Sequence, residues 1–317
     1  MEHETHNGCC PNSVLVGPVD RFVFGVLRNF WWQRKLAAAL LVTKLNAITA
    51  VIGILCPTFM AGTTLVVFVT ERGIVLSSDS KTTLRNSDFS TSTGEIEQEK
   101  FVIIQNRVVV AAVGVSDIAT AFGHYNFLTW VKGLQLQIPN HVSVDALAEI
   151  IQKESASTFS KLRIADFVKT GALKNKSPAD PCEMFAQFVI VGYQDGTPHV
   201  HKIYFYIDWN SLTFTGPIKA LLYPDSEVSN YRVIRFGTQQ AIADFLSGKG
   251  YAHQQAVTAC PKAMASIRDG IYPSLAETIC LSRVLVEVEK STNPSDVEGA
   301  VRTVKILPSG QAVATGN

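Results

Sequence analysis

Apolar residues gather in short runs after residue 62, with turn-forming residues between the runs. Valine, leucine and isoleucine dominate these runs, as is typical of buried strands. Gly73 lies in the first gap, and Asn106 lies in a later one. We expect two β-hairpins, formed by residues 63–70 with 74–78 and by residues 101–104 with 108–113.

Further along the chain the apolar spacing changes to three and four residues, which indicates helices. Ser116 and Asp117 start one expected helix, whose apolar stripe reaches Leu128, and Ser143 starts another. The order of strands, helices, strands and helices favours an α+β protein with segregated layers. We expect strands over 185–206, 284–288 and 301–306 and helices over 239–246, 254–268 and 273–281.

Three polar residues mark the ends of the first expected strands. Thr63 starts one strand, Asp79 ends the next and Lys100 enters a third. A threonine at a chain terminus carries its own base, because its α-amine has an ordinary pKa of about 7.7–8.0. A lysine and an aspartate nearby would tune that amine. The hypothesis therefore includes cleavage of the bond between Gly62 and Thr63.

These residues resemble the proteasome β-subunit and its bacterial relatives among the N-terminal-nucleophile (Ntn) hydrolases. Asp79 follows Thr63 by 16 residues, and Gly114 follows Lys100 by 14 residues, as in that family. Lys100 follows Thr63 by 37 residues, a few more than usual, and we attribute the excess to a Ser/Thr-rich loop over 86–94.

The resemblance implies a fold and a role for each residue. The implied fold is a four-layer αββα sandwich, in which two antiparallel sheets lie between helical layers. Thr64 would be off by one in its spacing to Asp79, which favours Thr63 as the nucleophile. The implied roles are nucleophile for Thr63, orientation of the lysine for Asp79, tuning of the amine for Lys100, oxyanion donor for the Gly114 N–H, and support for Ser80 and Thr238.

Two features depart from the family pattern. Thr238 follows Gly237 where the family has a serine, and the family's late Asp-x-x-Ser-Gly sequence is missing. Its nearest match is Ser295-Asp296-Val297-Glu298-Gly299, to which we assign no catalytic role. The departure favours, as an alternative, a catalytically inactive proteasome-like protein that is exported and acts as a binding or scaffold protein.

Residues 1–62 form an expected leader or propeptide, and residues 63–317 form the expected Ntn hydrolase domain. Basic residues up to Lys35 precede an apolar segment over 36–61, which resembles a secretory signal or a membrane anchor. Lys44 interrupts the roughly 20 apolar residues that a clean span needs, so a soluble propeptide is the alternative. A start nearer Val42 would make a compact signal.

Composition excludes some classes of function. The formal net charge is +1 and no dense lysine or arginine run occurs, so we expect no nucleic-acid partner. His199 and His201 would share one face of a strand, but we identify no third ligand, and we expect no metal and no cofactor. Three cysteines remain after loss of the leader, and we expect buried thiols. They are Cys182, Cys260 and Cys280.

The sequence thus predicts a threonine-type hydrolase of amide bonds, made as a zymogen and activated by autoproteolysis. The expected substrate is a peptide, with a small amide as the alternative, and a homo-oligomer is a further expectation. The expected location is periplasmic, extracellular or membrane-anchored through residues 36–61, with a cytoplasmic protein as the alternative.

Overall fold

The computed structural model divides the chain into two units, residues 1–59 and 60–317. All described residues belong to the second unit, so the predicted leader and the apolar segment 36–61 lie outside them. The predicted boundary at residue 63 stays a prediction. The structure describes residues 63–85, 92–97, 99–114, 117–120, 123–159, 164–165, 182–224, 231–237, 240–294 and 297–315.

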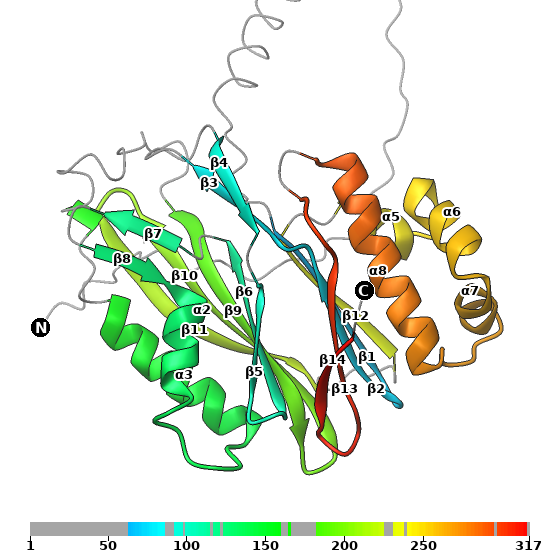
Figure 1. Cartoon of the computed structure of the whole chain (residues 1–317), viewed down its shortest axis with the longest axis horizontal. Helices are drawn as coiled ribbons and strands as arrows, with labels where there is room; N and C mark the ends of the chain where they lie inside the picture. The colour runs from blue at the N-terminus through cyan, green and yellow to red at the C-terminus, as the bar shows by residue number, and fades with distance from the viewer. Residues whose placement is uncertain are drawn as a thin grey trace, which may run out of the picture. The chain divides into compact units, whose positions relative to one another are not determined.

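Two five-stranded antiparallel sheets form the centre of the described domain (Figure 1). The first sheet contains, in spatial order, β12 (Tyr231–Gly237), β1 (Thr64–Thr70), β2 (Gly73–Ser78), β13 (Arg302–Ile306) and β14 (Ala312–Thr315). The second sheet contains β11 (Thr213–Tyr223), β10 (Thr197–Asp208), β9 (Cys182–Gln194), β6 (Val108–Gly114) and β5 (Phe101–Ile104). Two small hairpins are β3 (Lys81–Arg85) with β4 (Ser92–Glu97) and β7 (Asp117–Thr120) with β8 (Gly123–Asn126).

The two sheets face each other across a buried apolar cluster. In β1, Leu65 and Val67 belong to this cluster, whereas Val66 and Phe68 belong to another cluster on the opposite face of the sheet. The same alternation occurs in β6, because successive side chains of a strand point to opposite faces. Strands that are buried on both faces read as continuous apolar runs, which explains the sequence pattern.

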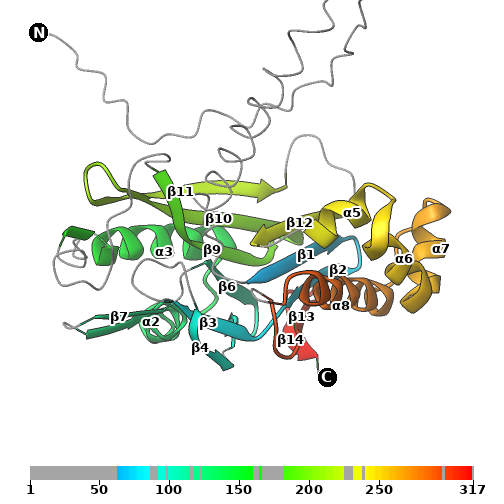
Figure 2. The ribbon, with the colours of Figure 1, turned by 90° about the horizontal axis from the view of Figure 1, so that it is seen from above.

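Helices cover the outer face of each sheet, and the described residues contain six of them. Figures 1 and 2 show α5 to α8 beside the first sheet and α2 and α3 beside the second. The domain is therefore α+β with two antiparallel sheets, an arrangement compatible with a sandwich. The helices are α2 (Phe127–Leu134), α3 (Val144–Phe159), α5 (Gln240–Leu246), α6 (Gly250–Ala259), α7 (Pro261–Arg268) and α8 (Leu275–Thr292).

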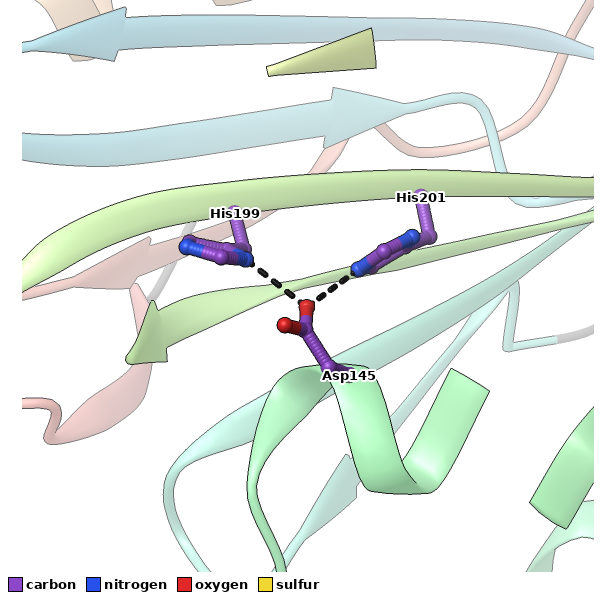
Figure 3. Close-up of side chains that lie close together, drawn as sticks. All are labelled: Asp145, His199 and His201. Atoms are coloured by element: carbon purple, nitrogen blue, oxygen red, sulfur yellow. Dashed lines mark hydrogen bonds and ion pairs between the residues drawn. The ribbon is translucent and has the colours of Figure 1, made fainter. Parts of the chain in front are cut away.

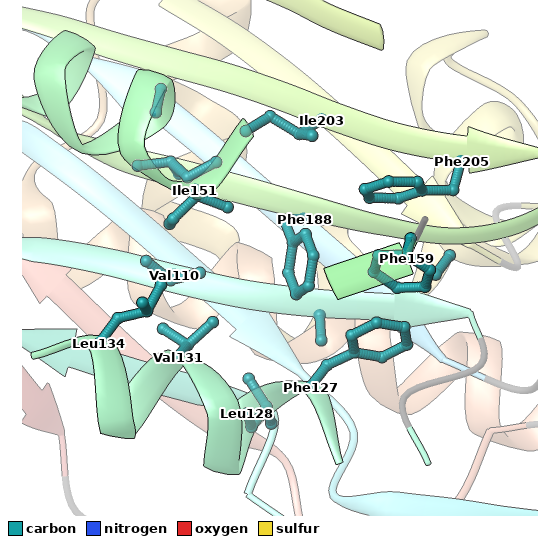
Figure 4. Packing of buried hydrophobic residues seen from close by; sticks show 14 of the residues in the cluster. Val110, Phe127, Leu128, Val131, Leu134, Ile151, Phe159, Phe188, Ile203 and Phe205 are labelled. Carbon is teal, nitrogen blue, oxygen red and sulfur yellow. The ribbon is translucent and has the colours of Figure 1, made fainter. Parts of the chain in front are cut away.

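The cluster between the second sheet and its helices is rich in aromatic rings (Figure 4). Phe127 from α2 stacks on Phe159 from α3 with ring centroids 5.1 Å apart, and Phe159 stacks on Phe205 of β10 at 4.2 Å. Such pairs add about 0.5–1.5 kcal/mol each beyond their buried area. They fix α2 and α3 against the sheet.

Three sequence predictions of secondary structure are wrong. The helix expected from Ser116 is a hairpin of β7 and β8, and the helix begins only at Phe127, where the Asn126 side chain accepts a hydrogen bond from the Thr129 N–H at 2.8 Å. Gly123 disfavours a helix in this stretch. The strand expected over 284–288 belongs to α8, because Leu281, Leu285 and Val288 recur at helical spacing and are buried. The helix expected over 254–268 ends at Ala259 and restarts at Pro261.

Candidate active site

Thr63 lies immediately before β1 and is buried. The neighbouring strand β12 fixes its position, because Thr64 pairs with Gly237 in the antiparallel register. Gly237 has a φ of +74°, and a Cβ at this residue would lie 1.7 Å from the Thr63 carbonyl oxygen. Only glycine allows the two backbones to approach this closely. The first sheet thus determines where the Thr63 hydroxyl points.

Lys100 reaches this hydroxyl from the second sheet. Its Nζ donates a hydrogen bond to Thr63 Oγ1 over 3.0 Å, and both residues are buried. The Ala112 N–H donates to the Lys100 carbonyl at 3.3 Å, which aligns the start of β5 with β6. Burial lowers the pKa of Lys100 to about 8, although the charge of Asp79 opposes this shift.

Asp79 directly follows β2 and is fully buried. Its Oδ1 accepts a hydrogen bond from the Thr64 N–H at 2.9 Å. Burial raises the pKa of Asp79 to about 6, while the Lys100 charge and backbone N–H groups, including that of Thr64, act in the opposite direction. Its Oδ2 has no hydrogen-bond partner within the described residues.

Because of these two pKa values, the site holds two opposite charges over a defined range of pH. Between about pH 6 and pH 8, Asp79 is ionised and Lys100 is protonated. Both groups have pKa values displaced towards neutrality by burial, which costs stability and is typical of functional sites. The arrangement can hold a hydroxyl beside a cation that loses its proton near neutral pH.

Ser80 lies beside the late segment to which the sequence analysis assigns no role. The Ala300 N–H donates to Ser80 Oγ at 2.9 Å, and the Lys81 N–H donates to the Glu298 carbonyl at 3.1 Å. Lys81 Nζ also forms an ion pair with Glu298. A Cβ on Gly299 would lie 2.6 Å from Ser80 Oγ, so this glycine permits the contact. Residues 298–300 therefore pack against the residues that directly follow Asp79.

Gly114 ends β6 with a φ of +90° and pairs with Ala186 of β9. A Cβ there would lie 2.8 Å from the Phe185 carbonyl oxygen. The adjacent Val113 lies 3.4 Å from the position of a Cβ on Gly237, whose backbone touches Thr63. Gly114 thus ends its strand beside the part of the first sheet that carries Thr63. Gly62 and Thr238, the other two predicted site residues, lie outside the described residues.

Two of the three cysteines differ from the prediction of buried thiols. Cys260, which immediately precedes α7, and Cys280, in the first half of α8, form a disulfide. The two cysteines are 20 residues apart in sequence with α7 between them, so spacing alone does not indicate the pair. Within the described part of the chain, no helix combines the length and apolar character that crossing a bilayer requires.

A second polar cluster joins α3 to β10 (Figure 3). His199 Nδ1 and His201 Nε2 lie 2.7 Å and 2.6 Å from Asp145 Oδ1. Gln194 Nε2 donates to Asp145 Oδ2 at 2.8 Å. Burial opposes ionisation of Asp145, but hydrogen bonds from the two histidines outweigh it and lower the pKa of this carboxyl. Asp145 supplies a third potential ligand atom beside the histidine pair, which the sequence analysis does not find.

No protein-family model matches this chain, and a search of curated proteins finds no match. The site is therefore interpreted from its own geometry.

Sequence reasoning singled out Thr63, Asp79 and Lys100 but missed other residues around them. Gly237 was noted only as the residue before Thr238, although its positive φ and contact with Thr63 make it part of the site's architecture. A glycine at the end of an apolar strand was the one available signal. Asp145 lay beyond sequence reasoning, because 54 residues separate it from His199 and no spacing rule spans that distance.

Proposed function

We propose that this protein is a threonine-type hydrolase of amide bonds, of the Ntn hydrolase class and similar to proteasome β-subunits. The observation that carries the proposal is the 3.0 Å hydrogen bond from Lys100 Nζ to Thr63 Oγ1 in a buried site next to Asp79. An ordinary strand threonine needs no buried lysine beside it, because burying an ammonium group is costly. A reaction at the Thr63 hydroxyl accounts for the presence of a buried lysine despite this cost.

The architecture supports the same class of protein. Two antiparallel sheets face each other, and helices cover the outer face of each. This is the order of layers expected for the αββα sandwich of Ntn hydrolases. In this arrangement Thr63 and Asp79 come from the first sheet, and Lys100 comes from the second. The site therefore forms only when both sheets are packed together.

Activation begins while Thr63 is still bonded to Gly62. Neutral Lys100 accepts the proton of Thr63 Oγ1, which attacks the Gly62 carbonyl carbon. The C–N bond then breaks, the Thr63 nitrogen takes a proton, and an ester joins Gly62 to Thr63 Oγ1. Water then hydrolyses this ester, which releases the Gly62 carboxylate and restores the Thr63 hydroxyl beside the amine that the acyl shift has freed. With a pKa of about 8, roughly a tenth of Lys100 is neutral at pH 7, which suffices for a single slow turnover.

In the mature enzyme the freed amine replaces Lys100 as the base. An α-amine with an ordinary pKa of about 7.7–8.0 is well matched to neutral pH. Protonated Lys100 disfavours a second positive charge on the amine, and Asp79 keeps Lys100 in place. The Gly114 N–H stabilises the oxyanion. In other enzymes, the loss of one such donor raises the activation barrier by about 2.7–4 kcal/mol. Thr63 Oγ1 gives its proton to the free amine and attacks the substrate carbonyl carbon, the substrate C–N bond breaks, and the leaving amine takes that proton. Water then hydrolyses the acyl ester on Thr63, which releases the acid and restores the hydroxyl.

We further propose that the protein is exported. Disulfides persist in oxidising compartments and are rare in the cytosol, so the Cys260–Cys280 bond supports a periplasmic or extracellular location. The basic and apolar leader supports it independently, as the pattern of a secretory signal. The proposed substrate is a peptide, with a small amide as the second choice.

Turnover of substrate by variants tests the proposal. The full chain is assayed with fluorogenic peptides and with acyl-amino-acid amides. Thr63→Ala removes the nucleophile and should reduce turnover to background, whereas Thr63→Ser should retain part of it. Thr64→Val is the matched control, because it keeps the backbone N–H that holds Asp79. Turnover by Thr63→Ala would refute the assignment, and an inactive, uncleaved wild type would favour the scaffold alternative.

A further inference from the structure

We propose that Asp145, His199 and His201 form a binding site for a zinc-class divalent metal ion. Their three potential ligand atoms lie within 4.8 Å of one another. The site is independent of the proposed hydrolase site. His199 and His201 share the face of β10 that carries Ile203 and Phe205, which pack beneath α3, whereas Thr63 precedes a strand of the other sheet. Figure 3 shows the two rings and the carboxylate converging from β10 and α3.

The residue types fit this class of ion. Imidazole nitrogen and carboxylate oxygen are the ligands of many zinc sites, and three protein ligands leave a fourth position for water or another molecule. His199 presents Nδ1 and His201 presents Nε2, and both nitrogens face Asp145 Oδ1. The His201 side chain is only 6% exposed and that of His199 15%, which fixes both rings against the sheet.

The backbone explains why the carboxylate meets the histidines. Gly192 of β9 pairs with His199 of β10. A Cβ at Gly192 would lie 2.8 Å from a methyl group of Val144, the first residue of α3. The missing side chain therefore lets the start of α3 approach the sheet, and this approach brings the next residue, Asp145, to the two rings.

Gln194 completes the arrangement by orienting Asp145. Its Nε2 donates to Asp145 Oδ2, and its Oε1 accepts from the Asp145 N–H at 3.2 Å. This leaves Oδ1 facing both histidines. Partners that hold a ligand from outside are typical of metal sites, and their loss commonly weakens metal binding about 10–100-fold.

Metal entry requires a small expansion of the cluster. The nitrogen-to-Oδ1 distances of 2.6 Å and 2.7 Å are those of hydrogen bonds. Tetrahedral zinc with bonds of about 2.0–2.1 Å separates its ligand atoms by about 3.3 Å. Asp145 can move by this difference of roughly 0.6 Å, because its side chain is 39% exposed at the start of a helix. The two ring nitrogens are the widest pair among the three atoms, which lie within 4.8 Å of one another, and they must also move closer together. A metal ion then takes the place of the proton on each coordinating ring nitrogen, and these protons move to the other ring nitrogens or are released to solvent.

Metal titration of the full chain tests this site. The protein is stripped with a chelator and titrated with zinc against a chromogenic competitor, and cobalt is used to record the absorption of a tetrahedral site. We expect one ion per chain and a rise in melting temperature on zinc addition. His199→Gln and Asp145→Asn should each weaken the zinc affinity at least about 10-fold. The matched control is His253→Gln in α6, a helix that covers the other sheet.

Each outcome decides the proposal. Loss of the bound ion in His199→Gln and Asp145→Asn, with binding kept in His253→Gln and with unchanged circular dichroism, supports it. Wild-type protein that binds no zinc at micromolar concentration would show that the cluster is only hydrogen-bonded and would overturn it. Binding that survives in the double variant His199→Gln/His201→Gln would assign the ion to other histidines or cysteines and would overturn it equally.

Discussion

The Thr63 hydroxyl and the Lys100 ammonium depend on each other at the scale of single residues. Lys100 is buried with its Nζ 3.0 Å from Thr63 Oγ1, and its pKa is lowered to about 8. A buried lysine has little structural use here, because an apolar side chain of similar length would avoid the cost of desolvating a charge. Its value lies in supplying either a proton acceptor or a positive charge near neutral pH.

Substitution of Lys100 should slow self-cleavage even when the new side chain keeps the positive charge. Lys100→Met removes the amine, and Lys100→Arg keeps a charge that proteins do not deprotonate. Both should reduce the rate about 10²–10⁴-fold, the usual contribution of a general base. Time-resolved mass spectrometry of the precursor measures this rate. Lys132→Met is the control, because Lys132 is exposed and pairs only with Glu99 among the described residues. Normal cleavage in Lys100→Arg would contradict the role of base.

The pH dependence of self-cleavage should follow the pKa of Lys100. Below about pH 8 the neutral fraction of Lys100 rises tenfold for each pH unit, so the rate should rise likewise and level off above pH 8. Asp79→Asn removes the charge that raises the pKa of Lys100, so the midpoint should move to lower pH. Rates are measured from pH 6 to pH 10 by gel densitometry. A rate that is flat across this range would contradict the account.

The same pKa values predict the direction of the stability changes. Asp79 has a raised folded pKa of about 6, so its contribution to stability is lost as pH rises from about 4 to 6. Lys100 has a lowered folded pKa of about 8, so stability is regained as pH rises from about 8 to 10. Both groups therefore destabilise the fold most between pH 6 and pH 8, where the site would operate. Groups whose shifted pKa values destabilise the fold in this way are common in active sites.

At the scale of elements, the contact between β12 and the start of β1 positions Thr63, the proposed nucleophile. Gly237 allows this contact, since its backbone lies against the Thr63 carbonyl. Glu289 of α8 strengthens the same region, because its carboxylate accepts the Ala241 N–H at 2.7 Å near the start of α5, the helix that follows β12. The glycine and the buried carboxylate together fix where β12 ends.

Gly237→Ala should disrupt both stability and self-cleavage. Its Cβ would overlap the Thr63 carbonyl oxygen, and alanine disfavours a φ of +74°. We expect a loss of about 2–4 kcal/mol in the free energy of unfolding, measured by urea denaturation. Gly196→Ala is the matched control, because Gly196 has a φ of +77° but nothing within 4 Å of the position of its Cβ. Similar losses in the two variants would mean that the contact with Thr63 is unimportant.

At the scale of the whole molecule, the disulfide links the helical layer over the first sheet. Cys260 and Cys280 lie in the cluster of α6, α7 and α8, on the side of the first sheet away from the second. A cross-link that closes a loop of this length restricts the unfolded chain. Disulfides persist in oxidising compartments, so the stability of the domain depends on the compartment in which the protein folds.

Removing the disulfide should lower the free energy of unfolding by about 3 kcal/mol, the value typical of loops near this length. The double variant Cys260→Ser/Cys280→Ser avoids an unpaired thiol, and thermal unfolding with and without reductant measures the effect. Reductant should destabilise the wild type and leave the double variant unchanged. Equal sensitivity of the two proteins to reductant would contradict the assignment of the disulfide.

Local sequence patterns predicted part of this fold. The hairpins of β1 with β2 and of β5 with β6 were predicted because their strands are short, apolar and separated by turn residues. The polar residues at their ends could be named for the same reason. The middle of α8 was predicted wrongly, because the run from Val284 to Val288 has strand-like residues that packing on the first sheet holds in a helix.

Contacts between distant segments could not be predicted. The pairing of Gly237 with Thr64 and the meeting of Asp145 with His199 depend on how sheets and helices pack, which no local pattern encodes. The disulfide belongs to the same group. The role of Lys100 beside Thr63 is an expectation from the resemblance to Ntn hydrolases, since 37 residues separate the two, and its hydrogen bond to the Thr63 hydroxyl is not predicted.

The central claim is that Thr63 cleaves its own bond to Gly62 and then, with its α-amine freed as the base, acts as the nucleophile towards substrate. Intact-mass spectrometry of the purified chain, combined with sequencing of its N-terminus, tests this most directly. The account predicts that wild-type protein begins at Thr63 with a free amine, whereas Thr63→Ala and Lys100→Met retain Gly62. Mature wild-type protein with the Gly62–Thr63 bond intact, or Thr63→Ala protein cut at that same bond, would contradict it.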